Sequence, residues 1–249
     1  MADSQIIYLF IFSVYLMAGV IKGLLGLGLP TTAITLMSFF LTPLQALAMN
    51  ILPMFVANIW QFWRADQKPL LVKRYAPFAI TLTVTIFIGS FFTASLPMTY
   101  LQLVISLAVI IFALFNLFQK PIALSENRDV FWQITLGAFA GILGALTSMW
   151  AVPLVIYLLA RNLAPKAFVD ASGYLLLVGC LPLAIGYVST GIVTADIILP
   201  SLAGAIAALC GFGIGEYLRH FVNAVLFRRV LLWFFFLMGL RMASLAIIG

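Results

Sequence analysis

Charge is what this sequence lacks most: only 8% of its 249 residues are Asp, Glu, Lys or Arg, while 65% are hydrophobic. An ordinary soluble domain has about 25% charged residues and needs them to cover its surface. A chain with so little charge cannot present a polar surface, which excludes a soluble enzyme, and its hydrophobic content excludes disorder. The composition indicates an all-α protein that crosses a membrane several times.

Groups that do chemistry are also scarce. The two cysteines, Cys180 and Cys210, lie in apolar runs without a CxxC spacing or a neighbouring histidine, and one histidine with two scattered cysteines cannot build a zinc site. No pair of acids, no nucleophile beside a base and no Walker motif is present. The sequence therefore predicts neither an enzyme nor an ATP-driven pump, and we expect no metal and no cofactor. The net charge of +6 fits basic membrane loops, so we expect no nucleic-acid partner.

The spacing of the few charges predicts the number of membrane crossings, because a membrane helix needs about 20 mostly apolar residues. The runs from Lys22 to Arg64 and from Arg74 to Lys120 are each long enough for two crossings. The run over residues 130–160 is long for one crossing and short for two. Counting it as two gives ten segments in total, and merging neighbouring segments gives eight.

The distribution of basic residues favours ten segments. Lys and Arg collect in the cytoplasmic loops of membrane proteins. With ten segments, every basic residue except Arg241 falls on one side, whereas with eight segments several of the 13 fall on the other side. We therefore predict a multi-pass protein of the cell's inner (plasma) membrane, with both termini outside and membrane lipid around it.

Two parts of the chain share a pattern at an offset of about 122 residues. Residues 18–21 (AGVI) recur as 140–143 (AGIL), and the same offset carries Pro43 onto Pro165. This pattern indicates a duplication into residues 1–122 and 123–249, and five segments in each half would insert the second half upside down. Inverted repeats, with a substrate site at their interface near the membrane midplane, are a common transporter plan.

Each half also contains a stretch typical of a broken helix. A proline destabilises a helix interior by about 3 kcal/mol and prefers the first turn of a new helix, as Pro30 and Pro153 would allow. Helices that restart inside the protein would direct free N–H groups and positive dipole ends inward, where an anion could bind. The alternative is that the small residues only let helices pack closely. The candidate residues of the two breaks are Gly26, Gly28, Thr31, Thr32, Thr147, Ser148 and Trp150.

Three further polar residues are candidates for anion contact. Asn50 and Ser172 occupy matching positions in the two halves, and their alternative role is a hydrogen bond between helices worth about 0.6 kcal/mol. Arg241 lies in the last apolar segment, where it either attracts anions at the outer mouth or reaches outward to the interface. Lys22 is interpreted as a topology charge that could instead face the inner entry, and Asn58 as a contact between helices.

Residues 18–30, followed by Thr42-Pro-Leu-Gln-Ala-Leu-Ala-Met-Asn50, resemble the sulfite exporter TauE/SafE family, with a weaker echo at 137–148 and 164–172. The resemblance covers essentially the whole chain, although Thr147-Ser-Met-Trp150 stands where more glycine is expected. It implies a permease for a small anion, such as sulfite or an organosulfonate like sulfoacetate. Such a permease would be a secondary transporter that moves one half against the other in alternating access.

Two alternatives remain at the level of sequence: an anion channel, and a membrane assembly subunit that transports nothing. The direction of transport, coupling to protons and assembly into a homo-oligomer are open.

Overall fold

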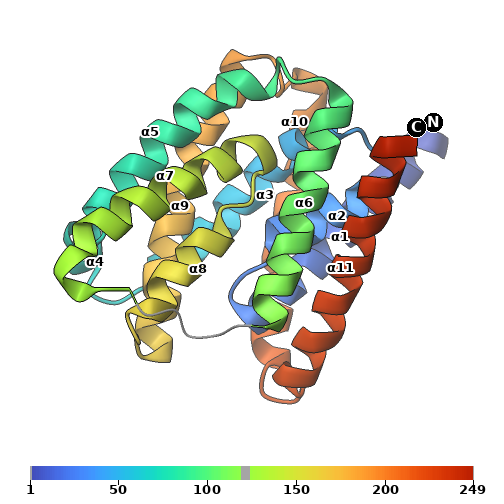
Figure 1. Ribbon diagram of the computed structural model, residues 1–249. Helices are drawn as coiled ribbons and strands as arrows, with labels where there is room; N and C mark the ends of the chain where they lie inside the picture. The colour runs from blue at the N-terminus through green and yellow to red at the C-terminus, as the bar shows by residue number, and fades with distance from the viewer. Residues whose placement is uncertain (1, 119–123, 249) are drawn as a thin grey trace.

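The computed structural model describes residues 2–118 and 124–248, and over these ranges it consists of helices joined by turns (Figure 1). Within these ranges, eight helices are long and apolar enough to cross a membrane. They are α1 (Ala2–Leu25), α3 (Pro43–Trp63), α5 (Ala76–Thr93), α6 (Met98–Leu117), α7 (Asp129–Thr147), α9 (Pro165–Ser189), α10 (Ala195–Leu218) and α11 (Ala224–Ile248). The chain is therefore an all-α, multi-pass membrane protein, as predicted.

Two of the ten predicted segments are short helices. These are α2 (Leu29–Met37), with 9 residues, and α8 (Ala151–Ala160), with 10 residues. At 1.5 Å per residue each is about 15 Å long, or half of the roughly 30 Å hydrocarbon core. The structure therefore agrees with the alternative of eight full-length membrane-crossing helices. The other two predicted segments, α2 and α8, are too short to cross the hydrocarbon core. The connections contain α4 (Lys68–Arg74) and the 3-10 turn η1 (Glu126–Arg128).

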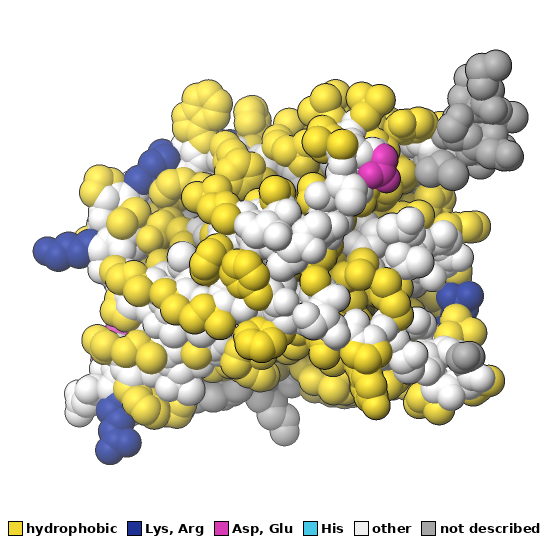
Figure 2. Space-filling view, turned by 90° about the horizontal axis from the view of Figure 1, so that it is seen from above, with side chains coloured by type: hydrophobic (Ala, Val, Ile, Leu, Met, Phe, Trp, Pro, Cys, Tyr) yellow, Lys and Arg dark blue, Asp and Glu magenta, His cyan; other side chains and the backbone are white. Residues whose placement is uncertain are grey.

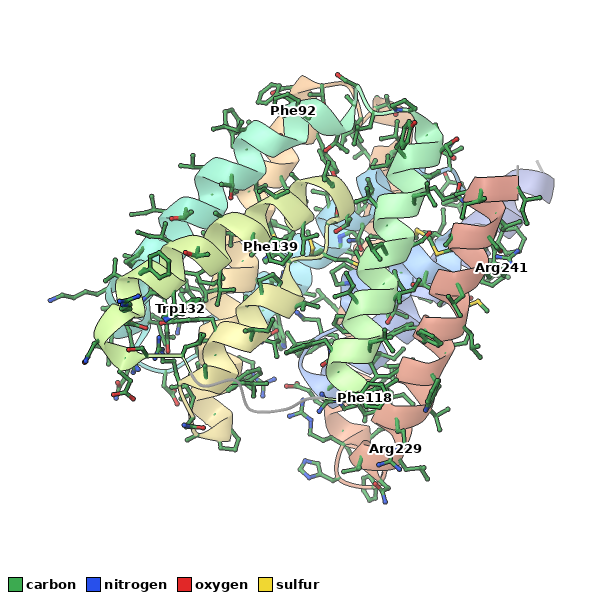
Figure 3. The ribbon with its side chains drawn as sticks, viewed as in Figure 1. Phe92, Phe118, Trp132, Phe139, Arg229 and Arg241 are labelled. Carbon is green, nitrogen blue, oxygen red and sulfur yellow. The ribbon has the colours of Figure 1, made fainter. Side chains whose placement is uncertain are left out.

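Most of the basic residues that the structure describes lie in or beside helix ends at one end of the bundle, which we call the basic end. Helix α1 begins and α11 ends at the opposite end (Figure 1). Two ion pairs join helix ends at the basic end, Arg64 with Glu216 and Arg161 with Asp129. Arg241 lies toward the other end of α11 from Arg229 (Figure 3). Seen from the end opposite the basic end, the surface is mostly apolar or uncharged, with Lys and Arg at its margin (Figure 2).

The prediction of a cytoplasmic and an outer side is based on this location of the basic residues at one end. Lys120, which belonged to that prediction, lies outside the described residues.

Glycine allows two pairs of helices to approach closely. Helix α1 packs along α10, and α5 packs along α7. A Cβ atom on Gly19 of α1 would overlap the carbonyl oxygen of Ala208, and one on Gly141 of α7 would overlap the side chain of Thr85. The small residues therefore do have the packing role that the sequence allowed as an alternative.

The helix pairings are reciprocal between the two parts of the chain. If the short α4 is set aside, α1 and α7 are the first helices of their halves, and α10 and α5 are the fourth. Each first helix packs on the fourth helix of the other half, while α3 packs on α9 and α6 packs on α11.

A partly buried ionic cluster fixes the end of α8 to the start of α7. The Arg161 guanidinium lies 2.7 Å from the Asp129 carboxylate, and its side chain is only 5% exposed. The Tyr157 hydroxyl and the Gln133 amide also donate to this carboxylate, at 3.0 and 2.8 Å. The carboxylate thus accepts two hydrogen bonds and forms an ion pair with Arg161, so this contact holds the end of α8 against α7.

Candidate functional site

The first helix break lies between α1 and α2. Gly26 and Gly28 have φ angles of 81° and 101°, in the left-handed region that glycine adopts without steric cost. Gly28 is the N-cap of α2, and Pro30 lies in its first turn. The predicted restart of a helix at Pro30 is confirmed, and its first turn is buried inside the protein.

The second break lies between α7 and α8 and is built with side chains instead of glycine. Ser148 has a φ angle of 55°, and Trp150 is the N-cap of α8. The Thr147 hydroxyl donates to the Leu143 carbonyl at 2.6 Å and accepts the N–H of Met149 at 3.2 Å. The Thr147 hydroxyl therefore satisfies the backbone N–H of Met149, which has no helical partner at the break.

Both breaks meet at one small cavity of about 20 Å³. Its walls come from the two breaks and from α1, α3 and α9. The lining residues are Lys22, Leu27, Gly28, Pro30, Thr31, Met54, Asn58, Ser148, Met149, Trp150, Ala151 and Leu176. Residues far apart in the sequence are thus brought together where two helices begin.

The cavity contains a buried positive charge. Lys22 is 2% exposed, and its ammonium donates to the Asn58 carbonyl oxygen at 2.5 Å. The Asn58 amide in turn donates to the Cys180 sulfur at 3.3 Å. None of the ion pairs among the described residues includes Lys22. A buried charge without a counter-charge costs several kcal/mol, so this site has an excess of positive charge.

Two further donors belong to residues that line the cavity. The Trp150 indole N–H is buried and has no acceptor within the described part of the chain. The Ser148 hydroxyl, which is also buried, interacts with the Tyr187 hydroxyl. A buried polar group is normally hydrogen-bonded, and exceptions often mark a functional site. One cation, one unpaired N–H and one hydroxyl around one space are suited to a negatively charged ligand.

Of the predicted break residues, Gly28, Thr31, Ser148 and Trp150 line the cavity. Gly26 lines a neighbouring hollow at the basic end. The Thr32 hydroxyl donates to the Gly28 carbonyl at 2.8 Å, so Thr32, like Thr147, shapes its break from within its own helix.

The structure places the other three predicted residues outside this cavity. Asn50 is fully buried, and its amide nitrogen lies 4.0 Å from the Met54 sulfur. Ser172 donates to a backbone carbonyl one turn earlier, at 2.9 Å. Arg241 lies over the ring of Phe39, 4.3 Å from its centroid, near the end of α11 opposite the basic end.

Sequence reasoning gave too small a role to Lys22 and Asn58. Lys22 points into the protein and not into a loop. Its position offered a signal, because it lies one turn before Gly26, within the last turn of a helix that is about to break. Asn58 lies one turn from Met54 on the same face of α3, and the offset between Asn58 and Cys180 is the 122 residues of the sequence pattern.

Open space near the cavity is larger at the basic end. A hollow of about 520 Å³ there shares Leu27 and Gly28 with the cavity, and its other walls are mostly apolar. At the opposite end, a hollow of about 40 Å³ is lined by Leu41, Pro43 and Ala46, among others. The cavity is therefore closer to open space on the side that bears the basic residues.

An all-helical membrane protein in which two interrupted helices meet around a buried, donor-lined cavity has the architecture of a membrane transport protein. The comparison with known families agrees with that class. The family model described as sulfite exporter TauE/SafE matches residues 11–242, and the chain belongs to this family of membrane transporters. No curated protein and no solved structure matches the chain.

Proposed function

We propose that this protein carries a small sulfur-containing anion, such as sulfite or an organosulfonate, across the membrane as a secondary transporter. The observation that supports this proposal is the Lys22 ammonium, which is buried without a carboxylate among the described residues. A bound anion would supply the missing negative charge. The family description supports sulfur chemistry in the substrate.

In this proposal each group of the cavity has its own role. Lys22 attracts the anion, and Asn58 holds the ammonium in position through its carbonyl oxygen. Ser148 and Trp150 donate hydrogen bonds to anion oxygens. The first turns of α2 and α8 contribute free N–H groups and the positive ends of two helix dipoles.

The substrate would cross by alternating access between two inverted repeats, residues 1–122 and 123–249. Matching positions support this arrangement: the positive φ angles of Gly26 and Ser148 lie 122 residues apart, as do the N-caps Gly28 and Trp150. The unequal hollows favour a carrier over a channel, because a conducting channel needs space at both ends of its narrow region.

The two hollows are also lined by matching positions. Leu41 and Pro43 of the smaller hollow correspond to Leu163 and Pro165 of the larger one, at the same offset. The structure then corresponds to a state facing the basic, cytoplasmic side. In the opposite state the smaller hollow would widen and the larger one would close.

Flux measurements in proteoliposomes test the proposal, with labelled sulfite, sulfate, sulfoacetate and a plain carboxylate. We expect saturable flux of a sulfur anion, and its loss in Lys22→Gln. Lys73→Gln is the matched control, because Lys73 is exposed on the short α4. A pH gradient tests the proton as the coupling ion. Unchanged flux in Lys22→Gln, or no flux of any anion with folded wild-type protein, would contradict the proposal.

A further inference from the structure

One face of α3 joins the central cavity to the small hollow at the end opposite the basic end. Ala46, Asn50, Met54 and Asn58 recur every four residues and so lie along one side of this helix. Met54 and Asn58 line the central cavity, whereas Ala46 lines the small hollow. Asn50 therefore lies between the two spaces.

Helix α2, which packs on α3, has a corresponding face. Thr31 lines the central cavity, and Ser38 lines the small hollow. Thr35 is one turn from each of them, so it also lies between the two spaces.

Thr35 and Asn50 share an unusual property: both side chains are 0% exposed, and each has an oxygen without a hydrogen-bond partner in the described structure. Most buried threonines of this bundle differ from Thr35 in this respect. Thr32 and Thr147, for example, each donate to the carbonyl oxygen one turn earlier. The Asn50 carbonyl oxygen accepts no bond, and its amide nitrogen has only the Met54 sulfur at 4.0 Å. Two buried polar groups without hydrogen-bond partners, on helices that pack together, destabilise the protein unless a polar ligand or water binds to them.

We propose that Thr35 and Asn50 form a second binding station, for a small oxyanion on its way between the central cavity and the outer face. This inference rests on the proposed transport function. The Thr35 hydroxyl and the Asn50 amide donate to the anion, while the Asn50 carbonyl oxygen accepts from water that moves with it. Met54, which lines the cavity and contacts Asn50, separates the two sites in the present state.

The first test replaces both groups with apolar side chains of similar size, Thr35→Val/Asn50→Leu. We expect flux to fall about tenfold, equivalent to 1.4 kcal/mol in the barrier. Binding of the labelled anion to the detergent-solubilised protein should stay unchanged, because the cavity around Lys22 is intact. The control is Ser90→Ala, which removes an equally buried hydroxyl from α5, away from this path. Flux at the wild-type level in the double variant would overturn the inference.

The second test does not depend on the identity of the substrate. Asn50→Cys is made in a Cys210→Ser background, since Cys210 is an exposed thiol. Intact cells are treated with a membrane-impermeant methanethiosulfonate that bears a sulfonate. We expect Asn50→Cys to react from outside, and Ala48→Cys, buried on the other side of α3, to stay unreactive.

Equal lack of reaction at these two positions, in variants that elute as folded protein, would overturn the station. Loss of binding in Lys22→Gln is measured separately. The proposed function and the second station can therefore fail independently of each other.

Discussion

The Lys22–Asn58 pair allows a prediction in which stability and transport change in opposite directions. Lys22 is 2% exposed, and its ammonium donates a hydrogen bond to the Asn58 carbonyl oxygen. Replacing buried charged groups by apolar ones of similar volume is often neutral or stabilises by about 1–4 kcal/mol. We therefore expect Lys22→Met/Asn58→Leu to stabilise the empty protein by about 2 kcal/mol, a rise of roughly 4–8 °C in Tm. Transport should be abolished.

The single variant Lys22→Met sharpens this expectation. It leaves the Asn58 carbonyl oxygen buried without its donor, which costs about 1–3 kcal/mol. Its Tm should therefore lie below that of the double variant. Thermal unfolding in detergent, without added anion, measures all three proteins, and Lys73→Met on the exposed α4 serves as the control. A double variant that melts below the wild type would refute the idea that Lys22 is an uncompensated charge kept for a ligand.

Three further predictions follow from the packing and from the second break. Gly19→Leu should lower the free energy of unfolding by about 3 kcal/mol or more, because its side chain would meet the backbone of α10. The control Gly213→Leu, which has open space around it on α10, should elute like the wild type in size-exclusion chromatography. Asp129→Asn should lower the free energy of unfolding by about 2–3 kcal/mol, because it leaves Arg161 without its only carboxylate among the described residues. The effect is smaller than for a fully buried pair because the Asp129 side chain is 37% exposed; a change in Tm under 1 °C would contradict this. Ser148→Gly should raise stability by about 1 kcal/mol, since glycine suits its φ angle of 55°, yet lower anion flux; unchanged flux would argue against the hydroxyl as a ligand donor.

The sequence predicted the features that depend on long apolar runs and on strong backbone preferences. Hydrophobic length and charge spacing located every long helix, because crossing a bilayer leaves few other solutions. The restart at Pro30 was equally predictable, since proline and two nearby glycines leave few conformations open to that segment. At Ser148 the same type of break is made by a non-glycine residue, and the sequence pattern indicated it only through the repeat.

The composition of the cavity was only partly predictable. A lysine at the end of an apolar segment normally marks a cytoplasmic loop, so hydropathy alone gives Lys22 that role. In the structure Lys22 is not a loop residue, because α1 continues past it. The Lys22 side chain lies beside Asn58 of α3. Such a contact between helices depends on rotation and depth, which a hydrophobic pattern does not specify. Asn50 was chosen for its matching position, yet it lies one turn beyond the cavity on the same face of α3.

The glycine contacts have a mechanical consequence. Where backbone lies directly against backbone, no side-chain rotamers are available to absorb sliding or tilting, so such a helix pair moves as one piece. The pairs that glycine joins here are α1 with α10 and α5 with α7, and each pair takes one helix from each half of the chain. The stiff units therefore do not coincide with the two repeats that we propose. A rocking motion would therefore move the α1–α10 pair relative to the α5–α7 pair. The two short helices α2 and α8, which begin beside Lys22, lie between these pairs.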